Sequence, residues 1–147
     1  MTERKWAAPG SEEREYQQRY FDLVKRARAK GLHIFLKPDS IVKDYGGMNW
    51  KVAHLKGYGF PINEDTIYIA SSLNWRKRYE TLRHELIETK LMDENEMYWP
   101  AHCKALKDEH YTTPLPDKMI LVVRRPRRVV SGRNRPRSVA VAVSSLR

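Results

Sequence analysis

The sequence of 147 residues has a single cysteine, Cys103, and no long apolar run. One cysteine cannot form an intrachain disulfide, and it cannot supply the several thiolates of a cysteine-based structural zinc site. No stretch approaches the ~18 apolar residues that cross a bilayer, and the polar residues 1–6 are unlike a secretory signal. These absences favour an intracellular, cytoplasmic protein with no membrane partner.

Acidic residues are missing from the last part of the chain, which makes the distribution of the net charge of +10 uneven. Residues 118–147 hold nine lysines and arginines and no acid, whereas the rest of the chain holds 19 basic and 18 acidic side chains. We therefore expect a nearly neutral body and a basic arm with different partners. The predicted organisation is a flexible lead-in over residues 1–10, one domain over 11–113 and a basic arm over 114–147.

Periodicity and breaking residues predict the elements of the domain. Apolar residues recur at three- and four-residue steps after Ser11, which predicts a helix that Gly31 ends. Short β-branched and aromatic runs predict strands. The expected helices are 11–30, 75–92 and 99–110, and the expected strands are 32–36, 50–55, 66–70 and 119–123. The predicted fold class is α+β, with a small sheet packed on about three helices and a basic, β-rich C-terminal arm.

The most informative residues are His84 and Glu88, which are four positions apart in the helix expected over 75–92. Side chains at this spacing project from one helix face, one turn apart. An imidazole and a carboxylate so placed can bind one metal ion, as in the H-E-x-x-H zinc helix, with Glu88 where that motif has its second histidine. A catalytic zinc site commonly has three protein ligands and an open position for water. His102, on the next expected helix, is the best third ligand.

Glu85 lies between the two ligands in the sequence and is the candidate general base. A bound Zn²⁺ lowers the pKa of its water to about 7, and Glu85 would take the proton as the water attacks a carbonyl. Zn²⁺ is the expected cofactor, although a histidine and carboxylate set also accepts other divalent metals. Structural alternatives stay open at this point. Glu88 could pair with Arg83 or Lys90 on a solvated face, and His102 could be a buried structural histidine.

The strand expected over 66–70, a short loop and the helix with Arg83-His84-Glu85-Leu86 resemble the core of zincin-like metallopeptidases, over residues 66–106. The nearest likeness is to minimal zincins of phage or archaeal type. The resemblance implies that His84 is the first metal ligand and Glu85 the general base. It also implies that the strand before the zinc helix is an edge strand that holds an extended peptide by backbone pairing. The candidate substrate-binding residues are therefore Ile67, Tyr68 and Ile69.

The chain departs from the zincin pattern at two ligands. Glu88 stands where a histidine is expected, and His102 comes sooner than the downstream glutamate of gluzincins and later than the third histidine of metzincins. The leading functional hypothesis is nevertheless a metal-dependent hydrolase, a zincin-like peptidase that acts on a peptide or protein.

The basic arm supports a second hypothesis from another class. A nucleic-acid-associated structural or virion-type protein, with a vestigial metal site or none, would use arginines for bidentate phosphate contacts and would bind in a salt-sensitive way. The arm has no aromatic residue for base stacking. Its valine runs could instead dock on a protein partner. The candidate nucleic-acid contacts are Arg124, Arg125, Arg127, Arg128, Arg133, Arg135 and Arg137.

Overall fold

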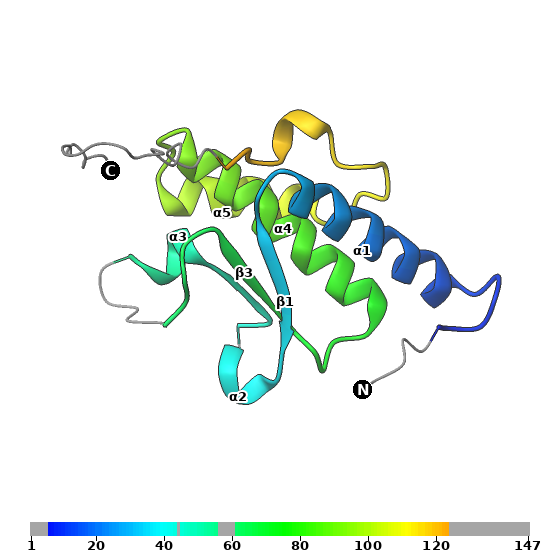
Figure 1. Cartoon of the computed structure of the whole chain (residues 1–147). Coiled ribbons are helices and arrows are strands. Elements are labelled where there is room, and N and C mark those ends of the chain that lie inside the picture. Colours follow the sequence, from blue (N-terminus) through cyan, green and yellow to red (C-terminus); the bar gives the residue numbers. More distant parts are fainter. Residues whose placement is uncertain (1–5, 44, 56–60, 124–147) are drawn as a thin grey trace, which may run out of the picture.

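The computed structural model describes residues 6–43, 45–55 and 61–123. These residues form a mixed α/β structure with a small three-stranded sheet, which confirms the predicted α+β class (Figure 1). From residue 124 on, the β-rich arm that we expected lies outside the described residues. Among them, no helix has the length and the apolar character that crossing a membrane would require. The described elements are α1 (Glu12–Ala29), β1 (His33–Lys37), α2 (Asp39–Val42), β2 (Gly47–Asn49), α3 (Trp50–Ala53), β3 (Thr66–Ala70), α4 (Trp75–Asp93), α5 (Tyr98–Asp108) and the 3-10 turn η1 (Asp117–Met119).

Local sequence signals set the ends of the long helices. Ser11 caps α1 by accepting a hydrogen bond from the Arg14 amide, and Gly31, at φ +101°, ends the helix in the left-handed conformation, as the sequence predicted. Asn74 caps α4 in the same way as Ser11 caps α1. At the other end of α4, Asn95 takes φ +73° and turns the chain back within four residues toward α5. This tight turn makes α4 and α5 a helical hairpin.

The sheet has the order β1-β3-β2, so β3 is its central strand. β1 pairs with β3 in parallel and β2 pairs with it in antiparallel. The prediction of an edge strand at 66–70 is therefore wrong. The sequence pattern could not show this, because a short strand from residues 47–49 pairs with β3 on the side expected to be free.

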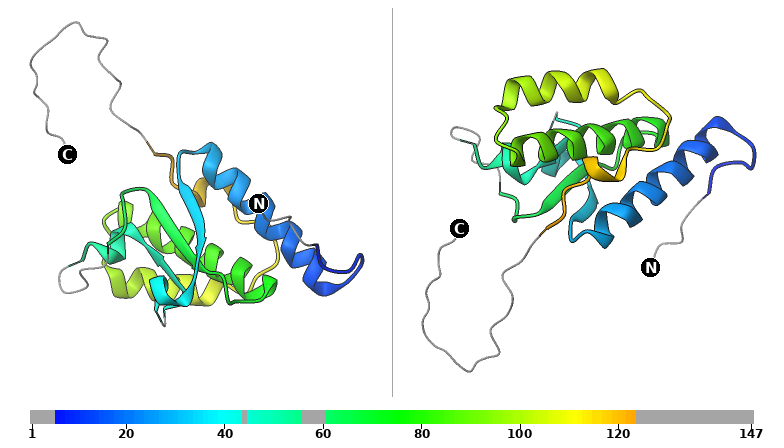
Figure 2. Two further views of the ribbon diagram at one scale, coloured as in Figure 1. Left: turned by 60° about the horizontal axis from the view of Figure 1, so that its bottom comes forward. Right: turned by 90° about the horizontal axis from the view of Figure 1, so that it is seen from above.

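α4 lies between the two other long helices, with α1 on one side and α5 on the other (Figure 2). Leu82 and Leu86 on α4 are fully buried, and they pack with Ile67 and Ile69 of β3 in the hydrophobic core. From residue 82 to residue 89, α4 is buried on every side, and the buried residues of the helix include five with charged or imidazole side chains: Glu80, Arg83, His84, Glu85 and Glu88. Polar groups at such positions need partners, and those partners define the candidate site.

Two expected strands are absent from the described structure. Residues 50–53 form the helix α3, because Asn49 caps its first turn and ends β2. Residues 117–119 form η1, and residues 120–123 do not join the sheet. Leu115 and Ile120 lie in the core, and the Val123 amide donates to the carbonyl of Lys30. The folded body thus continues past the boundary expected at residue 113.

The start of the described chain is also tied to the body. Ala7 exchanges hydrogen bonds with Gln17 and Arg14 of α1, and Trp6 packs against the ring of Phe21. Trp6 and Ala7 therefore contact α1, although they fall in the flexible lead-in that we expected over residues 1–10, of which residues 1–5 lie outside the described residues.

Candidate metal centre

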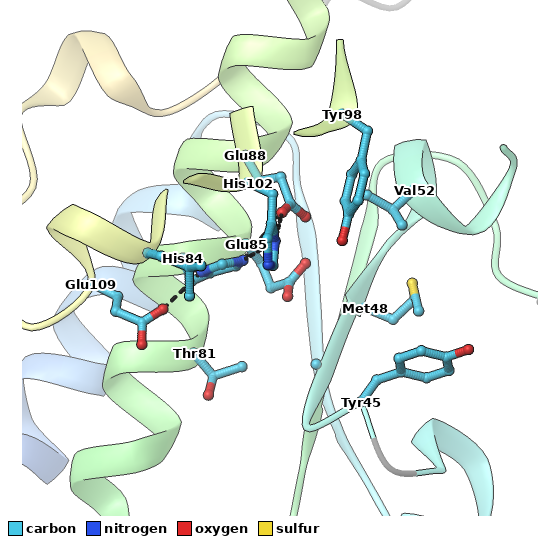
Figure 3. A pocket seen from close by; sticks show the side chains of 12 residues that line it. Tyr45, Met48, Val52, Thr81, His84, Glu85, Glu88, Tyr98, His102 and Glu109 are labelled. Carbon is cyan, nitrogen blue, oxygen red and sulfur yellow. Dashed lines mark hydrogen bonds and ion pairs between the residues drawn. The ribbon is translucent and has the colours of Figure 1, made fainter. Parts of the chain in front are cut away.

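Three side chains from α4 and α5 converge on one point. His84 and Glu88 project from adjacent turns of α4, and His102 reaches them from α5 (Figure 3). Glu88 Oε2 lies 3.1 Å from His84 Nε2 and 2.7 Å from His102 Nδ1, and the two ring nitrogens are 3.2 Å apart. Each residue can offer one ligand atom to a shared ion. The arrangement is the one that the spacing of these residues predicted.

The three donor atoms fit a tetrahedral metal ion. Ligands held about 2.1 Å from zinc at tetrahedral angles are about 3.4 Å from one another; the His84 contacts of 3.1 and 3.2 Å are close to this, and the Glu88–His102 contact of 2.7 Å would have to lengthen when an ion binds. A set of two imidazole nitrogens and one carboxylate oxygen suits zinc, iron or manganese. With no ion bound, protons hold the same atoms together: a protonated His84 donates from Nε2 to Glu88 Oε2.

Glu109 at the end of α5 fixes the orientation of His84. Its Oε1 lies 2.8 Å from His84 Nδ1, and because an ionised carboxylate only accepts, Nδ1 carries the proton and donates. In a neutral ring, Nε2 then keeps its lone pair and points at Glu88 and His102. A carboxylate on the outer nitrogen of a metal-binding histidine is the usual second layer of such sites.

Asn49, at the end of β2, contacts both glutamates of α4. Its Nδ2 donates to Glu85 Oε1 at 2.7 Å and to Glu88 Oε1 at 3.0 Å, and its Oδ1 accepts from the Val52 amide. Asn49 is fully buried. Gly47, two residues earlier, allows this approach, because a Cβ there would lie 2.5 Å from Thr81 Cγ2. β2 thus packs against α4 closely enough for an asparagine to reach the site.

The crowding of carboxylates changes the protonation of the site. Burial tends to lower the pKa of His84, but its hydrogen bond to Glu88 and the charges of Glu85 and Glu88 outweigh this and raise the pKa to about 9. Burial, and then repulsion from Glu88, raises the pKa of Glu85 to about 8. The site therefore holds protons that a bound cation would displace, because a cation reverses this balance.

A pocket of about 270 Å³ opens beside the three converging side chains. Glu85 projects into it from α4, and a largely apolar wall faces it from the segment that holds β2 and α3 (Figure 3). Tyr98 and Leu106 of α5 line it as well. The residues of the apolar wall are Tyr45, Met48 and Val52. One side of the pocket can thus supply charge and proton transfer, while the other receives apolar groups.

Glu88 does not pair with Arg83 or Lys90, and His102 is not fully buried. Arg83 pairs with Asp108 and Lys90 with Glu94, so neither neutralises Glu88, which is 3% exposed. The ring of His102 stacks on Tyr98 and Trp99 at the edge of the pocket and keeps about a quarter of its side chain exposed. His84, Glu88 and His102 therefore meet at a site that opens to the pocket.

The predicted substrate contacts through β3 are contradicted by the sheet. The backbone of β3 is paired on both sides, and Ile67 and Ile69 are fully buried. Tyr68 is half-buried and packs against Phe35 of β1. None of the three lines the pocket. The seven arginines proposed for nucleic-acid contact, from Arg124 to Arg137, lie outside the described residues.

Sequence reasoning missed Asn49 and Glu109. Neither lies near the ligand motif in the sequence, and only the packing of β2 and the far end of α5 brings them to α4. A weak signal was present for Asn49, since an asparagine after two glycines and before an apolar turn is typical of a helix cap. No local pattern distinguishes Glu109 from other surface acids.

Comparison with known proteins adds nothing to the geometry: no protein-family profile, no curated protein and no solved structure matches the chain.

Proposed function

We propose that this protein is a metal-dependent hydrolase of zincin-like type, with His84, Glu88 and His102 as ligands of a divalent ion, Zn²⁺ in the first instance. The convergence of these three donor atoms within 3.2 Å of one another carries the proposal. The polarising ion would supply a Lewis acid and a water of lowered pKa. A three-ligand set leaves one position open for that water.

Glu85 is the proposed general base. Its Oε1 is held by Asn49, while its Oε2 faces the wall at Gly47, where a Cβ would lie 3.3 Å away. Oε2 is thus free to take a proton from an attacking water and to return it to a leaving amine. A raised pKa suits both transfers near neutral pH.

The substrate that we propose is a peptide or protein that runs along β2. Gly47 and Met48 line the pocket, and β2 is at the edge of the described sheet. Because Gly46 accepts from the Ala70 amide, the alternation of an antiparallel pair turns the Gly47 backbone groups away from β3. Gly47 is itself buried, so an extended chain would pair with these groups only from within the pocket that Gly47 lines.

Exposed apolar side chains around the pocket favour apolar substrate residues. Trp99 is 65% exposed, Leu106 is 45% exposed, and they lie three and four positions from His102 on the same face of α5. Tyr45 is exposed on the opposite wall. A cluster of exposed apolar groups beside a polar centre is typical of a binding surface.

Metal content and hydrolysis test the proposal together. The native protein should contain about one metal ion by mass spectrometry, and His84→Ala and His102→Ala should each lose it, whereas the exposed His33→Ala should keep it. Glu85→Gln should keep the metal and lower peptide hydrolysis by about 10²–10⁴, while Glu64→Gln, on the surface, should match the unchanged protein. Unchanged turnover in Glu85→Gln would remove the general base from the proposal.

A further inference from the structure

Asn49 occupies a position that a capping role alone does not explain. It caps α3 through Oδ1, which accepts from the Val52 amide. Serine, threonine and aspartate cap helices as well as asparagine does. Only asparagine adds two N–H donors on the opposite side of the same short side chain, and both donors are used here, one on Glu85 and one on Glu88.

The orientation of the Asn49 amide is fixed by its partners. The Val52 amide can only donate, so it must face the oxygen of the side chain, and the carboxylates then face the nitrogen. All three polar positions of the amide are satisfied in a fully buried side chain. Rotating the amide would leave three buried groups without matching partners, which is strongly unfavourable.

In each of the two carboxylates, one oxygen accepts from Asn49 and the other has a different role. Glu88 Oε1 is held by Asn49, so only Oε2 is directed at His84 and His102. Glu85 Oε1 is held in the same way, and its Oε2 remains at the pocket wall beside Gly47. One amide therefore sets the rotation of a proposed ligand and of the proposed base.

We propose that Asn49 is a positioning residue that keeps Glu88 a one-oxygen ligand and thereby keeps one coordination position of the ion open. A carboxylate that binds through both oxygens would fill that position. This inference rests on the proposed metal site. It predicts that loss of the Asn49 donors changes the coordination of the ion before it changes the fold.

The variant that isolates the donors is Asn49→Ser, because serine still caps α3 but cannot reach both carboxylates. Its matched control is Asn74→Ser, which makes the same change at the exposed cap of α4. Zn²⁺ affinity should fall about 10–100-fold in Asn49→Ser, as for other residues that orient metal ligands, and should not change in Asn74→Ser.

The visible spectrum of Co²⁺-loaded protein gives a readout that a purely structural role would not move. Co²⁺ absorbs strongly in four-coordinate sites and weakly in sites of higher coordination. The unchanged protein and Asn74→Ser should show the strong bands, and Asn49→Ser should show weaker ones. The same bands in all three proteins would overturn the proposal.

A measurement on the unsubstituted protein covers the case in which Asn49→Ser does not fold. Both side-chain amide protons of Asn49 should exchange slowly with solvent in nuclear magnetic resonance spectra, with and without Zn²⁺. Rapid exchange of either proton would contradict the two hydrogen bonds.

The outcomes separate this inference from the proposed function. If the native protein binds metal and Asn49→Ser weakens it, but no peptide is cleaved, the positioning role stands and the hydrolase proposal falls. If peptides are cleaved and Asn49→Ser binds metal and cleaves peptides as the native protein does, the hydrolase proposal stands and the positioning role falls. A native protein that binds neither Zn²⁺ nor Co²⁺ overturns both.

Discussion

At the scale of single residues, the site depends on side chains that do not touch the proposed ion. Glu109 accepts from His84 Nδ1 and also lies 3.4 Å from His110 Nε2. His110, which is exposed, in turn lies 3.0 Å from the buried Glu80 of α4. His84 is therefore the inner end of a short chain of polar side chains, Glu109 and His110, that leads from the pocket to solvent.

Removing Glu109 should weaken metal binding without removing a ligand. In Glu109→Ala the His84 ring loses the acceptor that holds its Nε2 toward Glu88, and Zn²⁺ affinity should fall about 10–100-fold. Isothermal titration calorimetry measures the change. The control is Glu94→Ala, which removes a carboxylate paired with Lys90 at the far end of α4. Equal affinities in the two variants would show that Glu109 does not orient His84.

Gly47 is required by space, since a Cβ there would meet the Thr81 methyl at 2.5 Å. Gly47→Ala should destabilise the protein by about 1–3 kcal/mol, the usual effect of adding a methyl to a packed interface. Thr81→Ser removes that methyl, so the double variant should recover part of the loss, as urea unfolding would show. Additive effects in the double variant would place the strain elsewhere.

At the scale of elements, one arginine ties the α4–α5 hairpin together. Arg83 is 1% exposed, and its guanidinium donates to Asp108 at 2.5 Å, to Tyr79 and to the carbonyl of Thr113. These contacts hold the end of α5 beside α4. They therefore also hold Glu109, the next residue after Asp108, near His84.

Arg83→Met should destabilise the fold by about 3 kcal/mol, at the low end for a broken buried pair because Asp108 keeps access to water. Lys90→Met on the same helix breaks a more exposed pair and should change stability by less than about 1 kcal/mol. Chemical unfolding of both variants measures the difference. Similar values for the two would mean that Arg83 does not hold the hairpin.

The sequence predicted helices and the central ligand motif well because their signals are local. Ser11, Gly31 and the apolar stripes set the ends and faces of α1 and α4, and the four-residue step from His84 to Glu88 is a property of one helix. The order of the strands was not accessible in this way. β2 has only three residues, so no periodicity reveals that it pairs with β3.

The two residues that contact the proposed ligands from outside the ligand motif could not be predicted from the sequence, for a related reason. Asn49 and Glu109 come from elements whose placement depends on tertiary packing, and single residues on such elements carry no pattern of their own. His102 was predicted because it follows α4 after a short turn, so that an antiparallel return was the simplest path. The predicted part of the site thus consists of His84, Glu85, Glu88 and His102, all from the α4–α5 hairpin.

At the scale of the whole molecule, a rise in pH should lower the stability of the metal-free protein and should increase the stabilisation that a bound Zn²⁺ provides. The pKa of His84 is raised to about 9 and that of Glu85 to about 8. Both groups hold protons more tightly in the folded state than in the unfolded chain. Their contribution to stability is therefore present at low pH and is lost as the pH rises through these values.

Without metal, the protein should accordingly melt at a lower temperature at pH 9 than at pH 6. Zn²⁺ needs these groups deprotonated, so the stabilisation by Zn²⁺ should grow over the same range and reach about 2.7 kcal/mol at 100 times the dissociation constant. Melting curves with chelator and with Zn²⁺ measure both trends. His84→Ala should show no gain with Zn²⁺ at either pH, and a gain in the native protein that is independent of pH would contradict the linkage.

The short connection between α4 and α5 has a consequence for how the centre is assembled and inherited. All three donors lie between positions 84 and 102, within one hairpin. Closing so short a loop is fast and requires little ordering of the chain, so the donors can meet before the distant β2 joins them. A segment that carries its whole donor set in consecutive helices is also a unit that recombination can move intact from one scaffold to another.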